Sequence, residues 1–189
     1  MRTLKLTVAV ASLAAGLAHA GWAQSAPQAA VVPAGEEAVD PYTQTNANAG
    51  AAPFEGTAML ESFHGRDGIS RIVDDLVERV QVDARISEIF KASDFVRLRR
   101  TLKEQFCYIL NGGCDYSGRD MAAMHEDHGV AVKEFAALVE LLQDSMTREG
   151  VAFPAQNRFL AKLAPMKRDV VVRQRSSWRQ VSVRLTPST

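Results

Sequence analysis

The fold is decided around residues 112–125, which read GGCDYSGRDMAAMH. This stretch is polar and interrupted by glycine, so we expect a loop with short turns there and no long regular element. It overlaps the irregular segment 114–129, which holds His125 and His128, two of the four histidines in the chain. Because loops held by a rigid scaffold often carry ligand-binding side chains, these two histidines are the first candidates for a functional site.

The sequence on each side of this stretch has the periodicity of amphipathic helices, with apolar residues at spacings of three and four. Two such helices precede it, with apolar positions at Ile69, Ile72, Val73, Leu76, Val77 and Val80, and at Phe95, Leu98, Leu102, Phe106 and Ile109. Two follow it, with apolar positions at Val132, Phe135, Leu138, Val139, Leu142 and Met146, and at Phe159, Leu160, Leu163, Met166 and Val170. Pro165 falls inside the last pattern and is expected to kink that helix. Since no segment alternates as a half-buried strand does, the predicted fold class is all-α.

Residues 1–23 have the features of a secretory signal peptide. Arg2 and Lys5 precede an apolar run over residues 6–17, and small residues surround Ala20 and Ala23. The run is shorter than the roughly 20 apolar residues needed to cross a bilayer, so it is predicted to be cleaved after Ala20 or Ala23. The mature protein is therefore expected to be periplasmic or secreted.

Two further segments lack the pattern of a packed core, which leaves residues 56–172 as the folded domain. Residues 24–55 are rich in Ala, Pro, Gly, Asn and Gln, and they are predicted to form a disordered linker because they offer little apolar surface to bury. Residues 173–189 form a basic tail, predicted to be solvated, with contact to a membrane surface as the less favoured alternative. The whole chain has 22 basic and 22 acidic side chains, a balance that argues against general binding to nucleic acid.

The two cysteines, Cys107 and Cys114, lie seven positions apart. An exported protein can form disulfides, but these two could meet only if the helix carrying Cys107 ends between them. The Asn111-Gly112-Gly113 sequence allows such an ending, because glycine and asparagine adopt the left-handed conformation that stops helices. A disulfide and a pair of free thiols, one buried and one exposed, both remain open.

The motifs around the histidines resemble those of group I truncated haemoglobins. No Cys-x-x-Cys-His sequence or zinc-type ligand spacing is present in the sequence, and a lone histidine is more often a surface residue than a ligand. The resemblance is carried by a series of motifs in order along the chain, and it extends over about residues 59–172. Its elements are Gly65-Arg66-Asp67-Gly68-Ile69, Phe90, Gly112-Gly113, Tyr116-Ser117-Gly118-Arg119-Asp120-Met121, His125, Gly129-Val130 and Leu163-Ala164-Pro165-Met166.

This resemblance implies a two-over-two helical sandwich around non-covalent haem b, with His125 as the proximal iron ligand. His128 is the rival ligand, because it lies three residues further on. Phe90 matches the phenylalanine that packs on the distal haem face. The full set of residues expected to contact the cofactor is Val77, Phe90, Leu98, Leu102, Phe106, Tyr116, Met121 and His125.

The chain departs from the family on the distal side. Many members carry tyrosine or glutamine there, whereas the corresponding positions here are Val77, Leu98 and Leu102. Gln105, one helical turn beyond Leu102, is the alternative source of a hydrogen bond. A pocket without a donor cannot stabilise the negative charge that develops on bound dioxygen, so tight oxygen storage is not expected.

The resemblance predicts a haem-binding globin that reversibly binds oxygen, nitric oxide or carbon monoxide, with an electron donor as a further potential partner. Two alternatives belong to other functional classes. One is a haem enzyme that detoxifies nitric oxide or reduces peroxide, which would need a reductant and a distal group to manage protons. The other is a haem-free helical interaction domain, in which side chains would fill the pocket.

Overall fold

The computed structural model describes residues 32–171 of the 189-residue chain, and within that range the regular elements are all helical. The predicted signal peptide, residues 24–31 of the predicted linker and the basic tail lie outside the described residues. None of the helices in the described part is long and apolar enough to cross a membrane. The elements are η1 (Asn46–Ala49), α1 (Ala58–Ser62), α2 (Gly65–Val82), α3 (Ser87–Phe90), α4 (Phe95–Ile109), α5 (Met121–His125), α6 (Val132–Arg148), α7 (Phe153–Leu163), η2 (Ala164–Met166) and α8 (Lys167–Val170).

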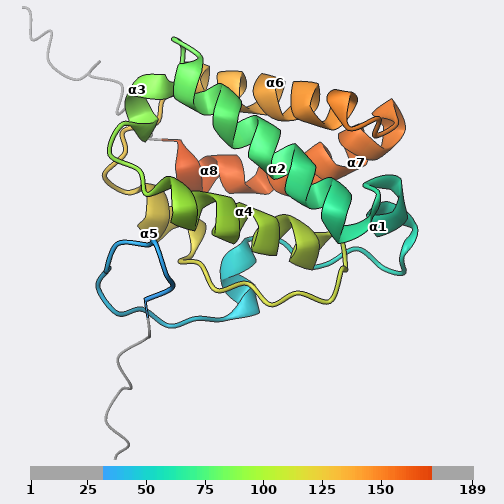
Figure 1. Ribbon diagram of the computed structural model, residues 1–189, viewed down its shortest axis with the longest axis horizontal. Helices are drawn as coiled ribbons and strands as arrows, with labels where there is room; N and C mark the ends of the chain where they lie inside the picture. Colours follow the sequence, from blue (N-terminus) through green and yellow to red (C-terminus); the bar gives the residue numbers. More distant parts are fainter. Residues whose placement is uncertain (1–31, 172–189) are drawn as a thin grey trace, which may run out of the picture. The chain divides into compact units, whose positions relative to one another are not determined.

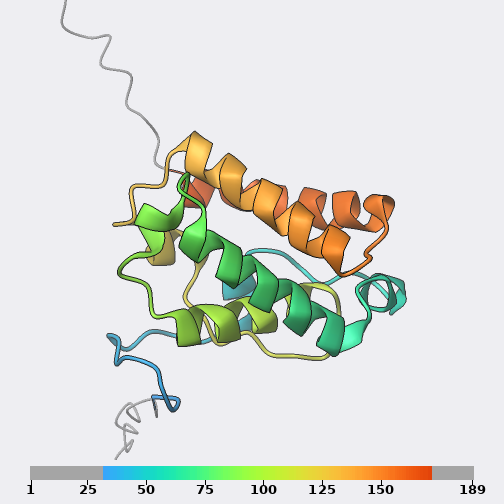
Figure 2. The same cartoon turned by 45° about the horizontal axis from the view of Figure 1, so that its top comes forward.

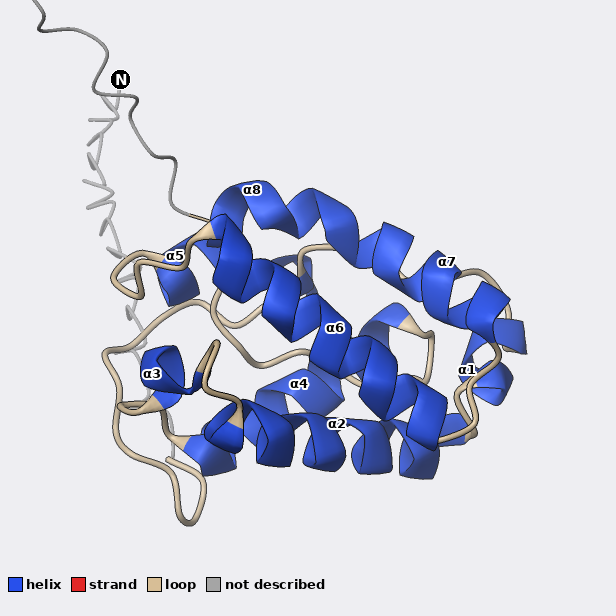
Figure 3. Ribbon diagram, turned by 90° about the horizontal axis from the view of Figure 1, so that it is seen from above, coloured by secondary structure: helices blue, strands red, loops and turns tan. Residues whose placement is uncertain are grey.

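The long helices form two packed pairs: α2 packs against α4, and α6 packs against α7. α2 packs against both α4 and α6, and in Figures 1 and 2 it runs between these two helices. Seen from above in Figure 3, α6 lies alongside the run from α7 to α8. Between the pairs, the ring of Phe159 meets the rings of Phe63 and Phe106 edge-on, each at a centroid distance of 5.0 Å. The predicted all-α fold class is confirmed.

Local signals explain where the helices begin and end. The Asp94 side chain accepts hydrogen bonds from the first backbone amides of α4, and the Asp120 side chain caps α5 in the same way. α4 ends before Asn111, which has a φ of 62°. The last predicted helix is interrupted at Pro165, because α7 gives way there to the 3-10 turn η2 before α8. The expected kink is therefore confirmed.

Residues 32–55 are ordered on the surface of the helical domain, so the prediction of a disordered linker is wrong over this range. Arg97 and Arg100 of α4 donate hydrogen bonds to the carboxylate of Glu36, which is 1% exposed. Further along, Ala49 is completely buried. Composition suggested disorder because the segment has few apolar residues, but its polar side chains and backbone find specific partners.

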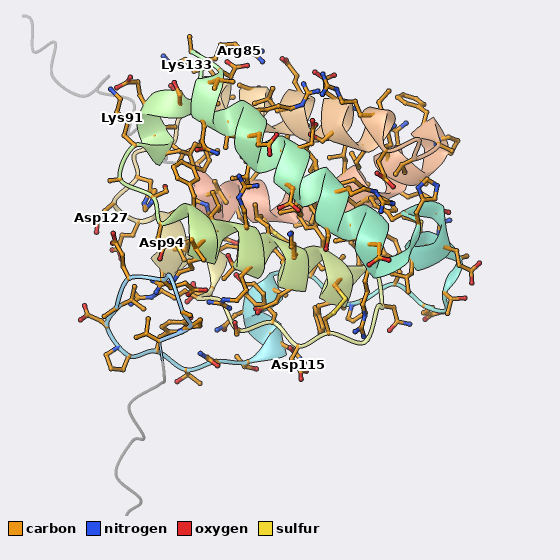
Figure 4. The ribbon with its side chains drawn as sticks, in the orientation of Figure 1. Arg85, Lys91, Asp94, Asp115, Asp127 and Lys133 are labelled. Carbon is orange, nitrogen blue, oxygen red and sulfur yellow. A yellow bond between two sulfur atoms is a disulfide. The ribbon has the colours of Figure 1, made fainter. Side chains whose placement is uncertain are left out.

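We call residues 36–50 the strap. It follows the outer side of α4 and of the loop before α5, and it contains η1 (Figure 1). Asp94 and Asp115, both labelled in Figure 4, contact it. The Asp94 carboxylate accepts a hydrogen bond from the Glu37 amide (2.8 Å), and the Asp115 carboxylate accepts one from Asn46 Nδ2 (3.0 Å). The strap thus contacts the helical domain at both of its ends.

Cys107 and Cys114 form a disulfide, which settles the alternative that the sequence left open. Their Cα atoms are 5.7 Å apart, and the bond joins the last turn of α4 to the loop before α5. Gly112 lies between them, where an added Cβ would be 2.7 Å from the Cys107 sulfur. A glycine is therefore needed at this position for the chain to turn back on the disulfide.

We predict that this disulfide is present in the purified protein. Denaturing the unreduced protein with iodoacetamide should leave its mass unchanged, and prior reduction should add two adducts because the chain has two cysteines. The Cys107→Ser variant is the control, since its remaining thiol should react without reduction. Adducts on the unreduced wild type would show that the bond does not form.

Candidate functional site

A cavity of about 490 Å³ lies between the two helix pairs. Its volume falls within the range of roughly 300–1,000 Å³ that is usual for small-molecule sites. Among the side chains that line it, Gln105 and His125 are polar and the others are apolar. The lining residues are Leu76, Val77, Val80, Phe90, Leu98, Leu102, Gln105, Phe106, Met121, His125, Phe135, Leu138, Val139, Leu142, Leu160, Ala161, Leu163, Ala164, Met166 and Val170.

Most of the site residues predicted from the sequence come together around this cavity. They arrive from four elements, because α2, α3, α4 and α5 each contribute at least one. The predicted residues that line it are Val77, Phe90, Leu98, Leu102, Phe106, Met121 and His125.

Tyr116 is the exception: it was predicted to contact the cofactor, but it does not line the cavity. Its hydroxyl donates a hydrogen bond to the carbonyl oxygen of Arg119 (3.1 Å). The ring lies against Gly118, where an added Cβ would be 2.2 Å from the tyrosine oxygen. Burial raises the pKa of Tyr116 above its ordinary value. This tyrosine and the glycine two residues later therefore shape the loop before α5.

The imidazole of His125 is held in one orientation. It lies at the end of α5, and its Nδ1 is 2.7 Å from the carbonyl oxygen of Met121, one turn earlier. Because a carbonyl oxygen can only accept, Nδ1 is the protonated nitrogen and Nε2 keeps its lone pair. Burial lowers the pKa of His125, which favours the neutral ring. A neutral imidazole whose Nδ1–H is bound to a carbonyl is the form that ligates metals through Nε2.

His128 does not share this position. Its side chain is exposed and is not part of the cavity lining. The two imidazole rings are 6.1 Å apart between centroids. Of the two candidate histidines, His125 alone lines the cavity.

The wall formed by α2 and α4 is apolar. Val77 is completely buried, and it lines the cavity together with Leu98 and Leu102. Gln105, the alternative donor, is 6% exposed, and its Nε2 donates to the carbonyl oxygen of Ala49 in the strap (2.9 Å). The amide group of Gln105 is thus engaged by the strap.

The amide of Gln105 also lies near α5. Its Nε2 is 3.6 Å from the sulfur of Met121 and 3.8 Å from the sulfur of Met166. Met121 is the residue whose carbonyl holds His125. Gln105 is therefore packed against the base of the helix that carries the histidine.

The opposite wall was not predicted as part of the site. It comes from α6 and from the run of α7, η2 and α8, with large side chains such as Phe135, Leu138 and Leu163. The helical periodicity correctly placed these residues on buried faces. The sequence pattern could not separate a side chain that packs against another side chain from one that borders a cavity.

Comparison with known proteins agrees with this geometry. The bacterial-like globin family matches residues 58–172. A group 1 truncated haemoglobin of Mycolicibacterium paratuberculosis is 24% identical over 116 residues, which cover 61% of this chain and 85% of that protein. A group 1 truncated haemoglobin of Nostoc commune is 25% identical over 111 residues, which cover 59% of this chain and 94% of that protein.

Solved structures show the same fold. The truncated haemoglobin of Tetrahymena pyriformis in its Fe(III) form superposes with a TM-score of 0.58 at 20% identity, covering 60% of this chain and 97% of that chain. The 2/2 haemoglobin of a Synechococcus species, solved in the cyanomet state with covalently attached haem, gives a TM-score of 0.55 at 21% identity, with the same coverage. With the family match over more than half of its residues, the chain belongs to the bacterial-like globin family, as a group I truncated globin for which non-covalent haem is the implied cofactor.

Proposed function

We propose that this globin holds haem b in the cavity between its helix pairs, with His125 as the iron ligand, and that it reversibly binds a diatomic gas. The observation that carries the proposal is the orientation of His125. Its ring lines an apolar cavity, while its Nδ1 is bound to the Met121 carbonyl and its Nε2 is left to ligate. An imidazole fixed in this way matches the ligation that haem iron requires.

The other residues of the cavity fit a flat apolar cofactor. Haem iron, when bound, would supply the coordination position at which a gas binds. Phe90, Phe106 and Phe135 offer aromatic surface to the macrocycle, and the leucines and valines around them exclude water. Cysteine cannot attach the group covalently, because both cysteines are joined in the disulfide.

Because the cavity wall lacks a free hydrogen-bond donor, it favours rapid binding and release of dioxygen over tight storage. Val77, Leu98 and Leu102 cannot donate a hydrogen bond, and the Gln105 amide is engaged with Ala49. A charge-assisted hydrogen bond contributes roughly 1.5–3 kcal/mol, so dioxygen loses more from its absence than carbon monoxide does. Dioxygen should therefore leave quickly, while carbon monoxide and nitric oxide should be retained.

The alternative functions have less support. Nitric oxide detoxification or peroxide reduction would need an electron donor and a group that manages protons beside the gas. The polar side chains of the cavity lining are His125 and Gln105, and both have hydrogen-bond partners. A haem-free interaction domain would be expected to fill its interior with side chains, whereas this interior has a cavity of about 490 Å³.

We further propose that the protein is exported. This proposal rests on the signal-like pattern of residues 1–23, and a structural disulfide fits an oxidising compartment. Intact-mass measurement of protein recovered from the periplasm should give a chain that begins at Gly21 or Gln24. Recovery of a full-length cytoplasmic form alone would contradict export.

Replacing His125 tests the haem ligand. The His125→Ala variant should lose most of its haem during gel filtration, because no other described side chain of the cavity replaces the imidazole. The His128→Ala variant is the matched control and should keep its haem, since that side chain is exposed. Optical spectra of the two reconstituted variants, oxidised and reduced, measure the effect. An unchanged spectrum for His125→Ala would overturn the assignment.

Adding a donor to the apolar cavity wall tests the account of gas release. Val77→Tyr should slow dioxygen dissociation about tenfold if the hydroxyl recovers about 1.4 kcal/mol. Val77→Phe is the control, because it adds the same ring without the hydroxyl. Stopped-flow measurement of dioxygen dissociation compares them with the wild type. A wild type that already releases dioxygen slowly would show that the cavity contains a donor after all.

A further inference from the structure

We propose that the strap, residues 36–50, is a positioning element for His125, and that Tyr42 and Asn48 are its main positioning residues. The inference rests on the proposed function, because it assigns to the strap a role in presenting the haem ligand. The family match begins at residue 58, so the strap lies outside the part of the chain that resembles other globins.

The helix that carries His125 needs support from outside itself. α5 has five residues, and isolated helices of fewer than about 12 residues are not stable in water. It packs against α8, which has four residues. The loop that precedes α5 therefore determines how firmly His125 is held.

The strap holds this loop by its backbone carbonyls. The Tyr42 hydroxyl donates a hydrogen bond to the carbonyl oxygen of Ser117 (2.7 Å), and Asn48 Nδ2 donates one to that of Gly118 (3.1 Å). Both carbonyls lie within three residues of Asp120, the cap of α5. These two bonds thus fix the chain immediately before the helix begins.

A second set of contacts holds both ends of the loop. The Tyr116 amide donates to Asn46 Oδ1 (2.7 Å), while Asn46 Nδ2 donates to the Asp115 carboxylate (3.0 Å). Arg119 donates to the carbonyl oxygen of Asp40 (2.8 Å), and its guanidinium lies 5.0 Å from the centre of the Tyr42 ring. The strap therefore makes hydrogen bonds to all five loop residues between the disulfide and the cap, residues 115–119.

A third contact reaches α5 through Gln105. The Ala49 carbonyl accepts a hydrogen bond from Gln105, whose amide nitrogen is 3.6 Å from the sulfur of Met121. The carbonyl of Met121 in turn holds the His125 ring. At Gly50, which has a φ of +79°, an added Cβ would be 3.0 Å from Met166, so the strap needs glycine to approach this closely.

The strap can hold the loop before α5 in place because the strap is itself anchored to the long helix α4. Its Glu36 carboxylate is buried between Arg97 and Arg100 of α4. These arginines lower the pKa of Glu36, so the carboxylate stays ionised and paired at neutral pH. The strap therefore links the rigid α4 to the short α5.

The test removes the two bonds from the strap to the loop carbonyls in the full chain. The variant is Tyr42→Phe/Asn48→Ala, and the matched control is Tyr108→Phe/Asn157→Ala. Tyr108 is half-buried and Asn157 is exposed, and neither side chain makes a hydrogen bond within the described residues. Circular dichroism and the thermal midpoint of each haem-free protein verify that both variants fold.

Two readouts follow the haem-loaded proteins and one follows the haem-free chain. Haem transfer to excess apomyoglobin should be about fivefold faster or more for the strap variant, since the two hydrogen bonds that hold the loop are lost. Its iron–histidine stretching band, recorded by resonance Raman on the reduced protein, should shift or broaden. Without haem, amide hydrogen exchange should accelerate over residues 119–125 but not within α2. The control should match the wild type in all three.

The outcomes distinguish the inference from the proposed function. If the wild type takes up haem but the strap variant keeps the wild-type band, release rate and exchange, the strap does not position His125. If only the thermal midpoint falls, the strap is a structural support and the inference is also overturned. If the wild type takes up no haem, the proposed function fails, and the exchange data alone then report whether the strap holds α5.

Discussion

The hydrogen bond between His125 Nδ1 and the Met121 carbonyl is the interaction on which the proposed site depends. It selects the protonated nitrogen of the ring and leaves the other nitrogen available as a ligand. The bond lies within a helix of five residues, which cannot maintain its own geometry in water. The orientation of this helix must therefore be fixed by the parts of the chain around it: the disulfide after α4, the Asp120 cap and the strap that covers the preceding loop.

The cavity combines one oriented imidazole, that of His125, with walls that offer few other polar groups. The cavity, of about 490 Å³, lies between the two helix pairs, and the wall formed by α2 and α4 is apolar at Val77, Leu98 and Leu102. Gln105 would be the natural exception, but the strap engages its amide through Ala49. In the proposed function, this contact leaves the cavity without a free donor for a bound gas, which favours rapid exchange of dioxygen.

The long helices and most of the site could be predicted from the sequence, for different reasons. α2, α4 and α6 bury one face each, so their apolar spacing is sufficient evidence. His125 could not be singled out by spacing, and the family resemblance was needed to choose it. The strap was missed because its order comes from single polar residues such as Glu36 and Asn48, whose partners lie far along the chain. Tyr116 was misplaced because its motif marks a loop and does not mark a cavity wall.

The central claim is that the cavity binds a single haem through His125, and a titration of the haem-free chain with haemin tests it most directly. The account predicts a Soret band that saturates at one haem per chain and, after reduction, shifts to a sharp new position when carbon monoxide is added. The contradictory result is an absorbance that rises without saturation and follows haemin in buffer alone, because the cavity would then have no specific affinity for the group.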